Sequence, residues 1–161
     1  MNLMKYVALF IVVLTLPALA DESPKSLGEV KGVIISGLVE RHPFNLLPGT
    51  PEACERKVVS DWLVFHCSAK NVSLRVDGFG SRSHKAEFDK LSVFFKSQTN
   101  GDISREYYYR GTWIEEVNGL TVRSKIRLTV WYVDSNPKAV RGVVEFEDLG
   151  MSLGIQGTRQ E

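Results

Sequence analysis

The stretch that decides the fold is LTVRSKIRLTVWYVD, which runs from Leu120 to Asp134. Apolar side chains such as Ile126 and Leu128 fall on one parity along it, and charged ones such as Lys125 and Arg127 fall on the other. A repeat of two residues is the spacing of a β-strand that packs one face and exposes the other. We therefore expect a long strand at the centre of an antiparallel sheet.

The residue pair just before this strand, Asn118-Gly119, is one that two-residue β-hairpins favour. A hairpin there sets Tyr109 opposite Leu128 and Arg110 opposite Arg127. Apolar side chains then share one face and polar side chains share the other, on both strands. Because the alternation agrees on both sides of the turn, we expect this register to hold.

The turns on either side are expected to hold an odd number of residues, because a slip of one residue would turn every charged side chain inward. After the long strand we expect a three-residue loop, Ser135 to Pro137, and before the hairpin an odd loop or a bulge at Asn100-Gly101. The cross-strand pairs that these two loops predict are Leu128 with Val144, Ile126 with Phe146, Arg127 with Glu145, Lys125 with Glu147, Phe95 with Tyr107 and Lys96 with Glu106.

The shared apolar face carries several large aromatic side chains, which would fill a small barrel or sandwich and leave little room for a sizeable ligand. The predicted core consists of Val93, Phe95, Tyr107, Tyr109, Trp113, Ile126, Leu128, Tyr132, Val144, Phe146, Met151 and Leu153. The prediction is a single all-β domain over residues 21–161, a meander of about eight antiparallel strands closed into a barrel, with one short helix. A β-sandwich is the alternative.

The first half of the chain carries weaker signals. Val30 to Glu40 is rich in β-branched residues and predicts a curved first strand, whereas the prolines and glycine of Arg41 to Thr50 predict a loop. Thr50-Pro51-Glu52 has the cap, the first-turn proline and the acidic residue of a helix start, which predicts a short helix over Pro51 to Val59. Two strands, Trp62 to Ala69 and Asn71 to Asp77, and a glycine-rich loop, Gly78 to Glu87, are expected next.

The first twenty residues predict a secretory signal peptide. Lys5 gives the positive start, residues 7–16 the apolar run and Ala18-Leu19-Ala20 the cleavage pattern. Cleavage after Ala20 would place the mature chain in the periplasm or outside the cell, without a membrane-spanning run. In that oxidising compartment, Cys54 and Cys67 are expected to form a disulfide.

Charge narrows the class of partner. The chain has 20 Lys and Arg residues and 19 Asp and Glu residues, and the signal peptide takes away one base, Lys5. The mature chain is therefore neutral, which argues against nucleic acid or a membrane surface as a partner. The three histidines, His42, His66 and His84, lack a zinc-binding spacing, and no catalytic motif is evident. We therefore expect no metal, no cofactor and no enzymatic activity.

The outer face of the long strand is the first candidate binding site. Bases and aromatic side chains gather there, at Tyr108, Arg110, Arg123, Lys125, Arg127 and Trp131. Arg110 opposite Arg127 is an unfavourable like-charge pair, and an exposed tryptophan beside arginines is typical of a protein-binding surface. The alternatives are an ordinary solvated face whose bases are matched by Glu145 and Glu147, and a face on which a second sheet packs.

The loop from Gly78 to Glu87 is the second candidate, because flexible loops carry much molecular recognition. It offers Ser81, Arg82 and His84, although an ordinary connector would have the same composition. The two candidates together predict an exported, non-enzymatic protein that binds a protein partner, of an inhibitor or immunity type. The alternative is a carrier of a small apolar or lipid-like molecule inside the barrel, which a well-formed central cavity would favour.

Overall fold

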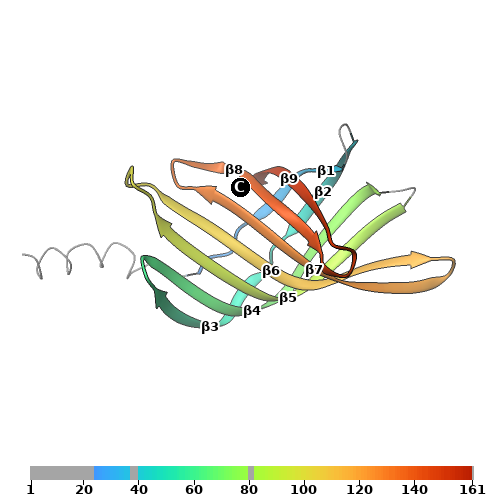
Figure 1. Cartoon of the computed structure of the whole chain (residues 1–161), viewed down its shortest axis with the longest axis horizontal. Helices are drawn as coiled ribbons and strands as arrows, with labels where there is room; N and C mark the ends of the chain where they lie inside the picture. Colours follow the sequence, from blue (N-terminus) through green and yellow to red (C-terminus); the bar gives the residue numbers. More distant parts are fainter. Residues whose placement is uncertain (1–23, 37–39, 80–81, 161) are drawn as a thin grey trace, which may run out of the picture.

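The structure, a computed structural model, describes residues 24–36, 40–79 and 82–160, which fold almost entirely into β-strands (Figure 1). The strands are β1 (Glu29–Ser36), β2 (Glu40–Leu47), β3 (Thr50–Val59), β4 (Trp62–Phe79), β5 (Arg82–Ser97), β6 (Ile103–Val117), β7 (Leu120–Val133), β8 (Asn136–Phe146) and β9 (Met151–Gln160). The one helical element in these ranges is a single 3₁₀ turn, η1 (Glu147–Leu149). All strand pairs are antiparallel, and the predicted all-β class is confirmed.

Eight strands close into the predicted barrel, and β3 is an additional strand. Neighbours run in the order β2-β1-β9-β8-β7-β6-β5-β4, and the ring closes because β2 also pairs with β4. This closing ladder is short, from Phe44 opposite Val76 to Leu47 opposite Ser73. The other half of the same edge of β4 is taken by β3.

β2 and β3 behave as one strand interrupted by Pro48-Gly49. The pairs on either side, Leu47 with Ser73 and Thr50 with Lys70, continue a single register along β4. Two predictions are therefore wrong, because residues 41–47 are a strand and not a loop, and residues 51–59 are a strand and not a helix. Pairing with β4 satisfies the backbone along this segment, and it outweighs the local turn and capping signals. The predicted first strand ends at Ser36, and residues 37–39 lie outside the described ranges.

The register predicted for the second half of the chain is largely confirmed. Tyr109 lies opposite Leu128 and Arg110 opposite Arg127, and Leu128 in turn lies opposite Val144. Between β7 and β8 the chain reaches the predicted register through a two-residue turn and a register shift between Trp131 and Val133, rather than through a three-residue loop.

Three of the six predicted cross-strand pairs are wrong in detail. The turn between β5 and β6 is centred on Asn100, one residue earlier than the predicted pairs require, so Phe95 lies opposite Arg105 instead of Tyr107. Lys96 lies opposite Ser104, and it reaches Glu106 diagonally, with Nζ 3.0 Å from Oε1. Glu147, predicted to oppose Lys125, lies in η1, where its carboxylate contacts Arg127.

Three neighbouring strands carry irregularities side by side. The register shifts between Glu52 and Glu55 in β3, between Ser68 and Val72 in β4, and between Phe88 and Lys90 in β5. A β-bulge bends its strand and increases the local twist, so three adjacent bulges bend the sheet as a unit. Residues 62–79 are therefore one long bulged strand, where two strands were predicted.

Aromatic rings fill the barrel interior. Every predicted core residue is buried except Met151, which is partly buried against the same cluster. Tyr107 stacks between Tyr132 and Tyr109, with ring centroids 6.2 and 6.5 Å away. Leu27, which precedes β1, belongs to this core, and the Tyr107 hydroxyl donates a hydrogen bond to the Lys25 carbonyl at 3.3 Å.

Gly111 allows β5 and β6 to approach each other closely. A Cβ atom at this position would lie 2.0 Å from the backbone carbonyl oxygen of Glu87. We expect Gly111→Ala to lower the free energy of unfolding by about 1–3 kcal/mol, the usual cost of overpacking. Gly154→Ala is the matched control, because nothing lies within 4 Å of a Cβ atom there. Urea denaturation measures both, and equal stabilities would contradict the prediction.

Two neighbouring tyrosines should respond in opposite ways to loss of the hydroxyl group. The Tyr109 hydroxyl is buried without a hydrogen-bond partner among the described residues, whereas Tyr107 donates to Lys25. Tyr109→Phe should leave the free energy of unfolding unchanged or raise it, and Tyr107→Phe should lower it by about 1 kcal/mol. Urea denaturation at neutral pH distinguishes these outcomes.

The same tyrosines predict how stability changes in alkali. Burial raises the pKa of Tyr107 and of Tyr109 above the ordinary value of 10.0, which means that folding favours their neutral forms. This contribution to stability is fully present below pH 10 and is lost as the pH rises toward the pKa values of the folded state. Stability that stays constant between neutral pH and about pH 11 would contradict this.

Candidate functional site

A hollow of about 920 Å³ lies on the outer face of the barrel and reaches from β3 to β8. Most of its lining side chains alternate with core residues along their strands, so they point away from the interior. We call this site the outer hollow. Two rows of cross-strand neighbours run along it, one of Glu55, His66, Ser92, Tyr108 and Thr129, and one of Ser68, Lys90, Arg110, Arg127 and Glu145.

Three bases lie side by side in the second row. Lys90 on β5 is opposite Arg110 on β6, and Arg110 is opposite Arg127 on β7. All three are exposed. Directly opposed side chains have Cβ atoms about 5 Å apart, a distance at which like charges destabilise the pair. This row therefore concentrates positive charge in the middle of the hollow, although the lining also includes the acids Glu55, Asp89 and Glu145.

Among the described residues, acids neutralise only one of these three bases. Arg127 Nε lies 2.9 Å from Glu147 Oε1 and 3.5 Å from Glu145 Oε2. Lys90 and Arg110 form no ion pair within the described ranges. A guanidinium group presents a fork of donors that fits a carboxylate, and an ammonium group adds a point charge. Lys90 and Arg110 are therefore placed to receive an anionic group from outside the chain.

A second hollow adjoins the first and widens access to the arginines. It has a volume of about 470 Å³, shares Arg110, Arg127 and Glu145 with the outer hollow, and continues to Ser152 on β9. The paired guanidinium groups are therefore reachable from two directions along the sheet.

An aromatic wall borders the bases. The Phe94 ring packs edge-on against Tyr108, with centroids 4.9 Å apart, and against Trp62, with centroids 5.7 Å apart. Lys96 Nζ lies 3.6 Å from the centroid of the Trp62 ring. The Tyr108 hydroxyl donates a hydrogen bond to the Glu106 carboxylate, and burial together with this bond raises the pKa of Tyr108. These contacts fix the wall as a preformed apolar surface.

A histidine–serine pair completes the first row. His66 Nδ1 lies 2.9 Å from Ser92 Oγ, and both residues line the outer hollow. A nucleophilic site of this kind also needs a group that orients the imidazole and donors for an oxyanion. Glu55 is opposite His66 on β3 but forms no ion pair with it among the described residues. We therefore interpret the pair as hydrogen-bonding groups for a ligand.

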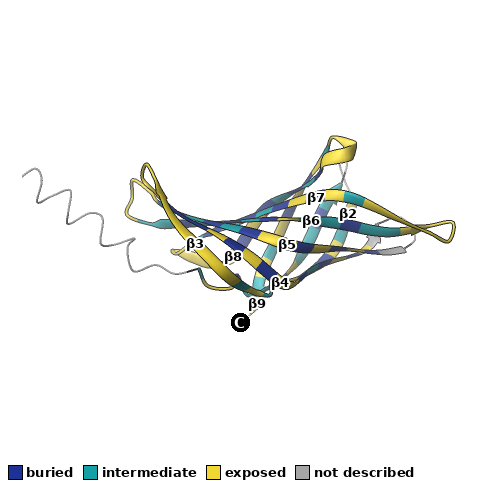
Figure 2. Cartoon of the chain, turned by 90° about the horizontal axis from the view of Figure 1, so that it is seen from below, coloured by how far each residue is buried: buried dark blue, intermediate teal, exposed yellow. Residues whose placement is uncertain are grey.

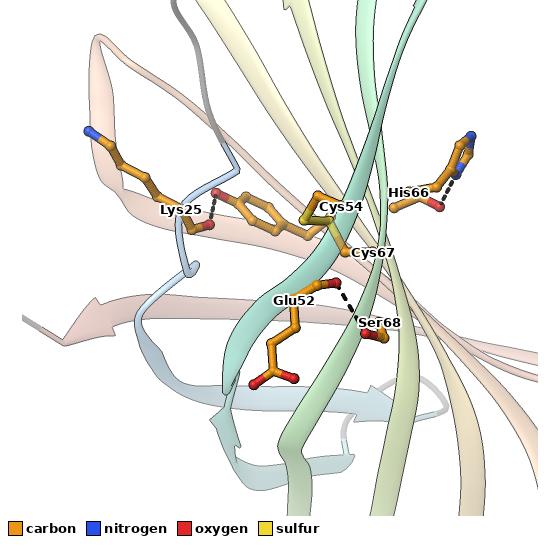
Figure 3. Close-up of a disulfide and its surroundings, with 8 residues drawn as sticks. Lys25, Glu52, Cys54, His66, Cys67 and Ser68 are labelled. Carbon is orange, nitrogen blue, oxygen red and sulfur yellow. Dashed lines mark hydrogen bonds between the residues drawn. A yellow bond between two sulfur atoms is a disulfide. The ribbon is translucent and has the colours of Figure 1, made fainter.

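The predicted disulfide is present, and it holds the bulge at one end of the outer hollow. Cys54 lies in the bulge of β3 and is bonded to Cys67 on β4, so the bond joins two strands rather than a helix and a strand. Figure 3 shows the disulfide on one side of β4 and His66 on the other side. Ser68 Oγ also donates a hydrogen bond to the Glu52 carbonyl at 3.1 Å. The bend in β3 is therefore held covalently, on the opposite side of the sheet from His66.

The structure brings together half of the first predicted cluster. Tyr108, Arg110 and Arg127 line the outer hollow. Trp131 is half-buried opposite Glu106, one row beyond the hollow. The other two, Arg123 and Lys125, are exposed farther along β7 toward the β6–β7 hairpin, outside the lining.

The second predicted candidate is not a loop, because β4 extends to Phe79 and β5 begins at Arg82. Ser81 lies outside the described residues, and only the backbone of Arg82 is described. His84 is buried, with its ring stacked on Trp113 at 5.4 Å between centroids and its Nδ1 3.2 Å from Glu115 Oε2. The pairing of β4 with β5 overrode the glycine and serine signals, and it turned His84 inward.

No protein-family model, curated protein or solved structure matches this chain. In the described ranges, no helix has the length and apolar character needed to span a membrane. The same ranges hold no group of three or more His, Cys, Asp or Glu side chains suited to a metal ion.

Sequence reasoning missed Lys90, Phe94, His66 and Ser92, which line the outer hollow. The sequence held a signal for Lys90. The buried apolar residues of β5 fall on even positions up to Phe88 and on odd positions from Leu91 onward. Such a change marks a bulge, and this bulge sets Lys90 beside Arg110.

Loss of the disulfide should loosen the outer hollow more than the opposite wall of the barrel. The bond spans a sequence separation of 13, for which a loss of about 3 kcal/mol is expected in the double variant Cys54→Ser/Cys67→Ser. Amide exchange should accelerate most at Glu55 and His66 and least at Ile155 on β9, a strand outside the lining of the hollow. Equal acceleration on both walls would show that the bond has no local role.

Proposed function

We propose that this chain is an exported, non-enzymatic binding protein that engages an acidic surface of a protein partner through the outer hollow. The observation that carries this proposal is the pair Lys90 and Arg110, two exposed and adjacent bases without an ion pair among the described residues. A chain gains nothing in stability from opposing like charges. Such a pair is understandable when a ligand supplies the missing negative charge.

The surroundings of the pair favour a protein over a small anion. The aromatic wall of Phe94, Tyr108 and Trp62 stands beside the bases, and Trp62 is 37% exposed. Arginine and aromatic side chains dominate the energetic centres of protein interfaces. An inhibitor or immunity-type protein, which captures one partner tightly without chemistry, would use a surface of this composition.

Export is part of the proposal, and the Cys54–Cys67 disulfide supports it because such bonds persist in oxidising compartments. The alternative carrier function has no observation in its favour. Aromatic rings occupy the barrel interior, where Tyr107 and Tyr109 are almost fully buried in van der Waals contact with the core. A carrier would need an apolar cavity in that position.

Reversing the unpaired charges tests the proposal. Lys90→Glu/Arg110→Glu should fold normally, because both residues are exposed, and should lose capture of the partner from an envelope extract of the source organism. Capture by the unmodified protein should weaken as salt is added, because the attraction is screened. Mass spectrometry of the retained proteins identifies the partner.

The matched control reverses the same number of charges outside the hollow. Arg123→Glu/Lys125→Glu lies on the same strand face, beyond the lining, and should retain capture. Normal capture by the Lys90→Glu/Arg110→Glu protein would reject the outer hollow as the binding site. Loss in both double variants would show that general charge, rather than the hollow, attracts the partner.

A further inference from the structure

β3 has one hydrogen-bonded edge and one open edge. It pairs with β4 from Thr50 to Val59, and it is the last strand in the order of the sheet. Figure 2 shows β3 exposed along most of its length, in contrast to the banded strands of the barrel wall. Its outer edge therefore presents a row of backbone donors and acceptors to solvent, which is a template for another strand.

The turn after β3 determines which backbone groups face outward. β3 and β4 are joined by a two-residue turn, with Val59 opposite Trp62. In such a hairpin the flanking pair exchanges both hydrogen bonds, and the pattern then alternates along the ladder. Glu55, Lys57 and Val59 bond toward β4, so the N–H and C=O groups of Arg56 and Val58 point to the open edge.

The two halves of this edge differ in how they are protected. Pro51 and the bulge at Ala53 and Cys54 interrupt the first half, and both features block pairing with another chain. The second half, Glu55 to Val59, has regular pairing with β4 and no proline. Val58 and Val59 are 52% and 48% exposed. Only the second half is open to a further strand.

The charges on this half indicate the kind of strand that fits. Arg56 and Lys57 are exposed and form no ion pair among the described residues. A second copy of β3 fits poorly, because the antiparallel registers that pair most of the segment place Arg56 opposite Arg56 or Lys57 opposite Lys57. A strand with acidic residues and β-branched neighbours would instead pair both bases and cover Val58.

We propose that an extended, acidic segment of the protein partner adds to the open edge of β3 as a further strand, paired with Arg56 and Val58. This inference rests on the proposed function, because the same partner would occupy the outer hollow. The two surfaces are continuous, since Glu55 belongs both to the open half of β3 and to the lining of the hollow. Backbone pairing would supply affinity, and the bases of the hollow would supply selectivity for acidic partners.

The experiment uses a fluorescent peptide, Thr-Val-Val-Glu-Glu-Val-Thr, whose adjacent glutamates point to opposite faces and can meet Arg56 and Lys57, and a counterpart with lysine in place of each glutamate. The acidic peptide should bind the full protein at least about ten-fold more tightly than the basic one. It should also protect the amides of Arg56 and Val58 from exchange, whereas those of Lys57 and Val59 should already be protected. Absence of binding, or binding that leaves the two outward amides unprotected, would overturn the proposal.

Val58→Pro removes one outward N–H group without removing a bond to β4, and Val58→Ala keeps that group and removes the side chain. The proline variant should weaken binding of the acidic peptide by about ten-fold, and the alanine variant by no more than about two-fold. Arg56→Pro compared with Arg56→Ala repeats the test if Val58→Pro does not fold. Equal loss in the alanine and proline variants would assign binding to the side chain and overturn the proposal.

Partner capture separates this inference from the proposed function. If Val58→Pro captures the partner normally while Lys90→Glu/Arg110→Glu does not, the added strand is rejected and the outer hollow stands. If the charge-reversed protein also captures normally, the proposed function itself fails. Protection of the Arg56 and Val58 amides on raising the protein concentration without peptide would identify a second copy as the occupant, and this too would overturn the proposal.

Discussion

The ladder between β2 and β4 is the interaction on which the rest of the structure depends. It pairs only Phe44 to Leu47 with Ser73 to Val76, yet it turns an open sheet into a closed barrel. Closure removes the edges of eight strands and encloses the aromatic core. Because β2 uses only part of the β4 edge, the remainder is left for β3, which continues in the same register outside the ring. The enclosed core and the open outer strand are two results of one short ladder.

The shape of the outer surface follows from defects in otherwise regular pairing. A closed barrel has a mainly convex exterior, and regular strands form no concave site on it for a ligand. The bulges in β3, β4 and β5 bend the wall where they lie side by side, and the Cys54–Cys67 disulfide holds one of them in place. Bases and aromatic rings then project into a shared hollow instead of fanning apart. Rigid strands would hold these side chains with greater accuracy than a loop.

The sequence predicted the fold best where its alternation is unbroken. From Ile103 to Phe146 the apolar side chains keep one parity on each strand, and only one register satisfies every strand at once. The position of Arg110 opposite Arg127 therefore follows from the alternation alone. In β3 the local signals of Thr50 and Pro51 favoured a helix, and the deciding interaction is with β4. The bulge that sets Lys90 beside Arg110 also depends on pairing between strands, and its only trace in the sequence is the change of parity between Phe88 and Leu91.

The pairing of β1 with β9 has a consequence for how the chain is made. Glu29 lies opposite Gln160 and Ile35 opposite Gly154, so the first strand of the barrel finds one of its two neighbours only in the last. Contacts between such distant parts of a chain form slowly. The entropy of closing a long loop is lost before any of these contacts can stabilise the fold. While a ribosome is still adding β8, the sheet can have no ring, and Leu27 has no complete core to enter. The barrel can therefore close only after β9 has been made, and until then β1 lacks one of its two neighbours.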